Sequence, residues 1–152
     1  MTRGLRLTLV TVTAFVAVTA LAGGIALILG STVPALSSVL VPPADYLRGS
    51  PFDSYAVPGL TLILFVGAPQ ALAGILTGVR WRFAMVACAA AGFSCAIWIF
   101  VQMIFIPFSP LQAVYFVIGM LELGLVMLGL GVLRPLTPPK TGSHRERRTR
   151  VP

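Results

Sequence analysis

Glu122 is the residue in this sequence with the clearest capacity for chemistry. It is a lone carboxylate near the middle of the apolar run from Leu111 to Leu133, which is long enough to cross a bilayer. A charged and unpaired carboxylate is costly inside hydrocarbon. Two states avoid this cost: a protonated Glu122 hydrogen-bonded to Gln70 or Thr19, or a Glu122 that faces a hydrated cavity and changes protonation during a cycle. The first predicts a helix-packing contact, and the second predicts a proton-coupled site.

Other polar side chains occur at comparable depths in the apolar runs. Gln70 lies near the middle of the second run and Thr19 at a similar depth in the first, so either could reach Glu122. A second polar layer, closer to the outer end, contains Gln102 and Tyr115, with Gln112 as a further candidate, and we expect it to join helices. The candidate intramembrane polar site therefore comprises Glu122, Gln70, Gln102, Tyr115 and Thr19.

Motifs of catalysis and of metal binding are missing from the sequence. It contains no HExxH, GxSxG or P-loop pattern and no cluster of paired carboxylates. Cys88 and Cys95 share one apolar run, about 10 Å apart along a helix, which is too far for a disulfide. His144 lies in a basic stretch without a second metal-binding side chain. We therefore expect no enzyme activity, no cofactor and no metal site.

The composition places these side chains in a multi-pass membrane protein. The chain is 57% hydrophobic and 10% charged, with a mean hydropathy of +0.96, whereas about 25% of residues are charged in a soluble domain. We predict an all-α fold: an antiparallel four-helix transmembrane bundle with a long extracytoplasmic loop between the first two helices. The predicted spans are residues 7–29, 58–79, 83–105 and 111–133, in a membrane domain of residues 1–134 followed by a disordered basic cytoplasmic tail of residues 135–152.

The first apolar run has an alternative interpretation as a cleaved signal peptide, because it follows a basic start and contains small residues at 20–23. The apolar core of a signal peptide is about 7–15 residues long. The run continues without a break to Leu29, so we favour a retained transmembrane helix.

Helical spacing predicts which faces point into the protein. One face of the fourth run carries small and polar residues, and the leucines at 121, 125 and 128 lie opposite. The second run has a stripe of small residues that would let helix backbones approach closely. Pro69 should kink this run by freeing the carbonyl of Phe65. The expected inward faces are Gln112, Tyr115, Gly119, Glu122, Val126 and Gly129 in the fourth run, Gly67, Ala71, Gly74 and Gly78 in the second, and Ala84, Cys88, Ala91 and Cys95 in the third.

The connection between the first two runs, residues 30–57, is rich in proline and cannot form one continuous helix. We expect a short surface helix at 35–41, and an aromatic belt of Tyr46, Phe52 and Tyr55 at the level of the lipid headgroups. This loop is either a structured cap over the mouth of the bundle or a platform for a substrate or partner.

The net charge of +7 follows the positive-inside pattern rather than indicating nucleic-acid binding. Ten of the eleven Lys and Arg residues lie in the N-terminus, the 80–82 turn and the C-terminal tail, and Arg48 alone lies on the other side. We therefore expect a multi-pass protein of the plasma membrane with both termini in the cytoplasm.

Two separated stretches resemble a family of membrane proteins. Residues 49–60 read GSPFDSYAVPGL at the start of the second run, and residues 98–102 read WIFVQ before the last run. The patterns S-P-F-x-x-Y-x-x-P-G-L and W-x-x-V-Q resemble those of small four-span integral membrane proteins, uncharacterised in function, from high-GC Gram-positive bacteria. The resemblance spans residues 40–130 approximately. It implies a four-span membrane fold and carries over no catalytic residue.

The sequence therefore predicts a non-enzymatic integral membrane protein with an accessory or structural role, which binds a partner or a lipid through its outer loop. The alternative is a small transporter or a proton-coupled membrane subunit that uses Glu122. The expected partners are the lipid bilayer and a membrane-protein partner or a second copy of the chain, and not nucleic acid.

Overall fold

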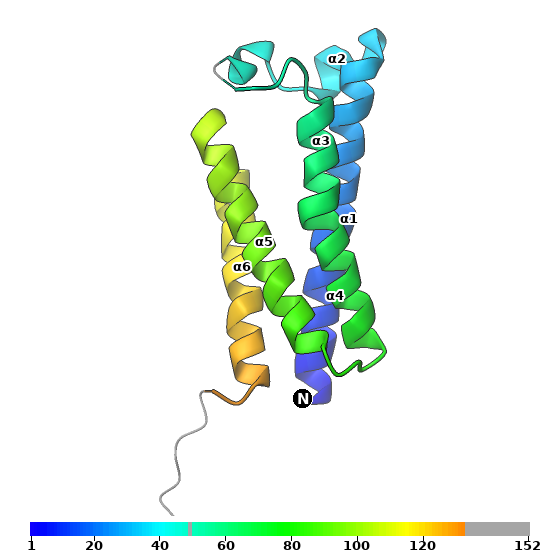
Figure 1. Ribbon diagram of the computed structural model, residues 1–152, viewed down its shortest axis with the longest axis vertical. Coiled ribbons are helices and arrows are strands. Elements are labelled where there is room, and N and C mark those ends of the chain that lie inside the picture. Colours follow the sequence, from blue (N-terminus) through cyan, green and yellow to red (C-terminus); the bar gives the residue numbers. More distant parts are fainter. Residues whose placement is uncertain (49, 133–152) are drawn as a thin grey trace, which may run out of the picture.

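The computed structural model describes residues 1–48 and 50–132, and within these residues the chain is helical and contains no strand (Figure 1). Four helical stretches are long and apolar enough to cross a membrane. They are α1 (Arg3–Thr32), the stretch Ala56–Gly78 made of α3 (Ala56–Leu62), η2 (Ile63–Gly67) and α4 (Ala68–Gly78), then α5 (Ala84–Phe105) and α6 (Pro110–Gly129). The predicted all-α class and the four apolar spans are confirmed.

Local sequence signals set the helix ends. The Thr2 hydroxyl accepts a hydrogen bond from the Leu5 amide at 3.3 Å, so α1 begins at Arg3 and is longer than predicted. Ser109 and Gln112 form a capping box at the start of α6. That helix ends at Gly129, earlier than predicted, because Gly131 takes a left-handed conformation with φ of 75°. The predicted tail, residues 135–152, lies outside the described residues.

The helices pack as two groups. α1 lies along α3 and α4, while α5 lies along α6, and α4 also packs on α5 (Figure 1). We use "arginine end" for the end of the bundle where Arg3 and Arg6 meet the 80–82 turn. The opposite end, which carries residues 33–55, is the "loop end". Figure 1 shows the α5–α6 pair leaning away from α1 and α3 toward the loop end.

Glycines allow α1 to approach α3 and α4 closely. A Cβ atom added to Gly24 would lie 2.6 Å from the carbonyl oxygen of Gly59, and one added to Gly59 would lie 2.7 Å from the carbonyl oxygen of Gly24. Farther along the same contact, a Cβ on Gly74 would lie 2.9 Å from the Thr13 hydroxyl. The two backbones are therefore in direct contact at the Gly24–Gly59 crossing.

The predicted inward faces are largely correct in α5 and α6 but partly wrong in α4. Gly119, Glu122 and Val126 are buried, whereas Ala71 and Gly78 are exposed. η2 is a π-helical segment. The buried residues of this stretch are Gly59, Val66, Gly67, Gln70, Ala73 and Thr77. α4 packs on both α1 and α5. The glycines of the predicted stripe, Gly67 and Gly74, lie against α1, whereas Gln70 and Thr77 contact α6 and α5 from a neighbouring face.

The segment at the loop end contains two short helices, α2 (Pro34–Leu40) and η1 (Ala44–Leu47). α2 agrees closely with the predicted surface helix and has no buried residue. It turns back against α1 at Gly30, where an added Cβ atom would lie 2.7 Å from a methyl group of Val41.

Candidate functional site

Gln70 and Glu122 form a buried pair between α4 and α6. The Gln70 side-chain amide donates a hydrogen bond to Glu122 Oε2 at 2.7 Å, and both residues are 0% exposed. The two residues are 52 positions apart in sequence. The sequence predicted Gln70 or Thr19 as the partner of Glu122, and the structure shows a hydrogen bond with Gln70.

The backbone just before Gln70 is joined to α5. Pro69 cannot donate a backbone hydrogen bond, so the Phe65 carbonyl is left without its usual helical partner. The hydroxyl of Ser94 in α5 donates to this carbonyl. Gln70 follows the buried Val66 by four residues and therefore lies on the same face of the helix.

The Gln70–Glu122 pair is incompletely satisfied. Gln70 Oε1 and Glu122 Oε1 are both buried and have no hydrogen-bond partner within the described residues. Both atoms act as acceptors when the carboxyl is ionised, so a donor is missing between them. A proton on the carboxyl supplies one O–H donor, which can serve Gln70 Oε1. The balance of donors and acceptors therefore favours a protonated, neutral Glu122. A neutral side chain also avoids the cost of burying a lone charge.

The surroundings of the pair are apolar and tightly packed. Toward the arginine end, Ala73 and Val126 belong to a core cluster with Leu9, Cys88 and Ala91. The Thr77 hydroxyl lies 3.2 Å from the sulfur of Cys88, and both residues are buried. Thr77 was not among the predicted site residues, although it lies seven residues after Gln70 and therefore on the same face of α4.

Thr19, Gln102 and Tyr115 lie apart from the Gln70–Glu122 pair. The Thr19 hydroxyl donates within α1 to the carbonyls of Phe15 and Val16, at 2.8 and 3.1 Å. All three side chains line a cavity of about 300 Å³ between the two helix groups, toward the loop end. The five predicted residues therefore divide into a buried pair and a separate set of three around a cavity.

This cavity adjoins a second one of about 290 Å³ beneath the loop segment. The first, which we name the inner cavity, reaches down to Val66 and Cys95. The second, which we name the outer cavity, is lined by Tyr46, Phe52 and Tyr55 among others. The residues that line both are Pro42, Trp98, Gln102 and Ile106.

Trp98 is the most informative residue at this junction. Its indole Nε1 is buried and has no hydrogen-bond partner in the described part of the chain. An indole N–H only donates, so it requires an acceptor or loses hydrogen-bond energy. The sequence showed Trp98 as the start of the W-x-x-V-Q motif and gave no signal that its N–H would be unpartnered.

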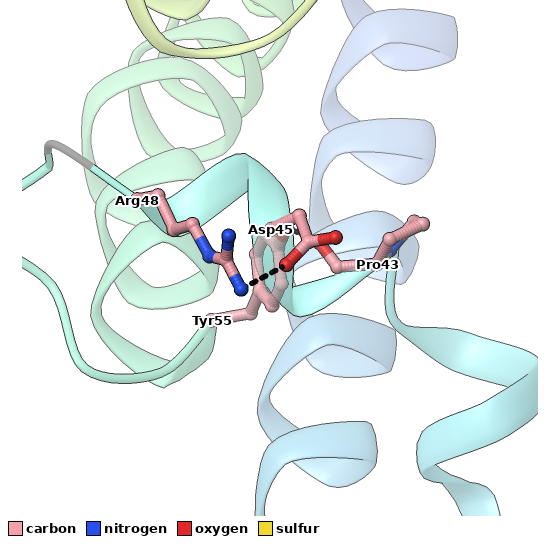
Figure 2. A network of polar contacts seen from close by, with 4 residues as sticks. All are labelled: Pro43, Asp45, Arg48 and Tyr55. Atoms are coloured by element: carbon pink, nitrogen blue, oxygen red, sulfur yellow. Dashed lines mark hydrogen bonds and ion pairs between the residues drawn. The ribbon is translucent and has the colours of Figure 1, made fainter.

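Two polar contacts join parts of the loop segment, and Figure 2 shows the four residues involved. The Tyr55 hydroxyl donates to the Pro43 carbonyl at 2.9 Å, and Arg48 pairs with Asp45 at 3.1 Å. Burial of its ring raises the pKa of Tyr55, and the neighbouring Tyr46 raises it further, so the hydroxyl remains a donor at neutral pH. The expected aromatic belt is therefore arranged differently: Tyr55 is buried, and it lines the outer cavity with Tyr46 and Phe52.

Comparison of the chain with protein-family models, curated proteins and solved structures finds no match. Functional assignment therefore depends on the residues and geometry of the chain itself.

Proposed function

We propose that this chain is a non-enzymatic accessory membrane protein that holds a lipid in the inner and outer cavities. The observation that carries the proposal is the unpartnered Trp98 Nε1 at the junction of two largely apolar cavities. Sites for small molecules are mostly apolar, with a few polar groups that fix orientation, and begin at about 300 Å³. The inner cavity meets this description.

Lipid chemistry fits the distribution of groups along the cavities. An acyl chain can pack against Leu62, Val66 and Ile99 in the inner cavity. An ester or amide carbonyl of the same lipid can accept from Trp98 Nε1 at the junction, where Gln102 offers a second polar group. The headgroup would then lie toward the aromatic side chains of the outer cavity, where tyrosine is favoured next to lipid headgroups.

The family resemblance supports the same site. Ser50, Phe52, Tyr55 and Pro58 belong to the first motif, and Trp98, Val101 and Gln102 belong to the second. All seven of these residues line the outer cavity, although the two motifs are far apart in sequence. We propose membership of the four-span family on this basis, with the cavity as the shared feature.

Filling the inner cavity is expected to prevent lipid retention. Gly23 lines this cavity, and the neighbouring Ala22 is exposed on the outside of α1. We expect wild-type protein, extracted in mild detergent and examined by native mass spectrometry, to keep one lipid that is absent from Gly23→Leu. Ala22→Leu adds a similar side chain to the outer surface and should keep the lipid. Equal lipid retention by the two variants would contradict the proposal, as would a wild type that retains none.

We also propose an antiparallel arrangement in the plasma membrane, with the arginine end cytoplasmic and the loop end extracytoplasmic. The positive-inside rule supports this orientation, since Arg3, Arg6, Arg80 and Arg82 lie at one end. The exposed large apolar side chains along the helices support membrane insertion.

Cysteine labelling can test the orientation with little background, because Cys88 and Cys95 are both buried. We expect Ser54→Cys to react with a membrane-impermeant maleimide added to intact cells. Thr2→Cys should react only after permeabilisation. Labelling of Thr2→Cys in intact cells would show that the orientation is reversed.

Proton-coupled transport is a second candidate function, favoured by the two unsatisfied oxygen atoms of the Gln70–Glu122 pair. A transporter would use a second state in which water reaches Glu122, because neither of the two cavities includes this residue in its lining. Glu122→Gln cannot exchange a proton, so it should abolish proton flux into liposomes loaded with a pH-sensitive dye. Unchanged flux in this variant would eliminate the candidate.

A further inference from the structure

A separate hollow of about 680 Å³ lies at the arginine end, remote from the inner and outer cavities. The first turn of α1, the 80–82 turn and the start of α5 surround it, and the last turn of α6 closes it at Gly129. Four arginines line it, Arg3, Arg6, Arg80 and Arg82. The guanidinium of Arg82 lies over the Phe83 ring, 4.3 Å from its centroid. No carboxylate lines it among the described residues.

The backbone adds little net charge to this hollow. α1 and α5 begin here, and the N-terminal end of a helix carries a partial positive charge. α4 ends just before Arg80 and α6 ends at Gly129, and these C-terminal ends carry the opposite partial charge. The Thr2 hydroxyl also caps the first turn of α1. The positive potential of the hollow therefore comes from its four arginines, which no carboxylate faces among the described lining residues.

Arg80 adopts a backbone conformation that normally belongs to glycine. Its φ is 58°, and it occupies the position after the C-cap of α4 in a Schellman turn. The two hydrogen bonds of that turn run from the Trp81 amide to the Leu76 carbonyl, at 2.9 Å, and from the Arg80 amide to the Thr77 carbonyl, at 3.3 Å. The end of α6 has the same turn with Gly131 at the equivalent position. A strained arginine where the chain elsewhere uses glycine points to a role for its side chain.

We propose that this hollow binds the phosphate group of an anionic phospholipid. Guanidinium groups bind phosphate oxygens in bidentate fashion, and basic pockets at the cytoplasmic ends of membrane helices suit such headgroups. A lipid is the source of the phosphate because large apolar side chains lie next to these arginines in the chain. Leu7, Val79 and Trp81 are each more than half exposed, and Trp81 lines the hollow. These side chains would contact the acyl chains while the arginines hold the headgroup, and Trp81 is of the type that prefers the bilayer interface.

The length of α1 agrees with this placement. A helix of 30 residues is about 45 Å long, against about 30 Å for the hydrocarbon core of a bilayer. Its first turn can therefore extend to the depth of the phosphates. The hollow is independent of the cavities at the loop end, so failure of one proposal leaves the other standing.

The variant Arg80→Gly separates ligand binding from stability, because it should change the two in opposite directions. Glycine adopts the required φ without strain, so we expect Tm in detergent to rise by about 2–4 °C. The loss of one arginine should lower selective binding of an anionic headgroup by about fivefold. If Arg80 has only a structural role, Arg80→Gly should change Tm without lowering selective binding of the anionic headgroup.

Binding can be measured by native mass spectrometry of the full-length protein with an equal mixture of phosphatidylglycerol and phosphatidylcholine of identical acyl chains. We expect wild type to bind phosphatidylglycerol preferentially, Arg80→Gly and Arg3→Gln to lose most of the preference, and Arg48→Ala at the loop end to keep it. The basic tail is unchanged in all variants, so it does not affect the comparison.

Equal binding of the two lipids by wild type would overturn the proposal, as would an unchanged preference in both Arg80→Gly and Arg3→Gln. Displacement of phosphatidylglycerol by excess inorganic phosphate would identify a free-anion site and would also overturn it.

Discussion

Gln70→Leu is expected to destabilise the bundle by about 1–3 kcal/mol, because it removes the described partner of a fully buried carboxyl group. Leucine is similar in size to glutamine, so the effect comes from the unsatisfied Glu122 rather than from a new cavity. Thermal unfolding in detergent, followed by circular dichroism, measures the change.

Two further variants distinguish this explanation from a general sensitivity of the site. Glu122→Gln should leave Tm nearly unchanged, because an amide at this position can accept from Gln70 Nε2 and also donate to the unsatisfied Gln70 Oε1. The double variant Gln70→Leu/Glu122→Leu should be more stable than Gln70→Leu alone, since no buried polar group is then left without a partner. A double variant as unstable as Gln70→Leu would show that the hydrogen bond has no special role.

Gly24→Ala is expected to destabilise the protein by about 1–3 kcal/mol through overpacking at the α1–α3 crossing. The added Cβ atom would lie 2.6 Å from the Gly59 carbonyl oxygen, and this backbone atom cannot move without separating the helices. The measurement is again thermal unfolding in detergent.

Gly78→Ala and Gly124→Ala are matched controls, because a Cβ atom at either position meets nothing within 4 Å. Both glycines lie in helices, where alanine is the better helix former by about 1 kcal/mol. We therefore expect the two controls to raise Tm slightly. A loss of stability in the controls similar to that of Gly24→Ala would refute the close-contact explanation.

The sequence was sufficient to predict features that depend on composition and regular helical period. Apolar length and the proline and arginine positions identified the four helices, and spacing of three and four identified the buried face of α6 with Glu122. Counting depth along the spans also named Gln70 as a partner of Glu122, which the structure shows as a hydrogen bond.

Features that depend on tertiary packing could not be predicted from the sequence. The second buried face of α4 arises because this helix packs on α5 as well as on α1, and the sequence does not show how many neighbours a helix has. The position of Thr19 beside a cavity depends on how α5 and α6 lean away from α1. The strain at Arg80 was also hidden, because an arginine in sequence gives no sign of a left-handed backbone.

The placement of Gln70 in the first helix group and Glu122 in the last helix has a consequence for biosynthesis. Synthesis runs from the N-terminus, so Gln70 is made 52 residues before Glu122. The buried hydrogen bond cannot form until α6 packs beside α4, and the amide of Gln70 lacks this partner until then. Docking of the final helix is therefore the step that completes the polar core.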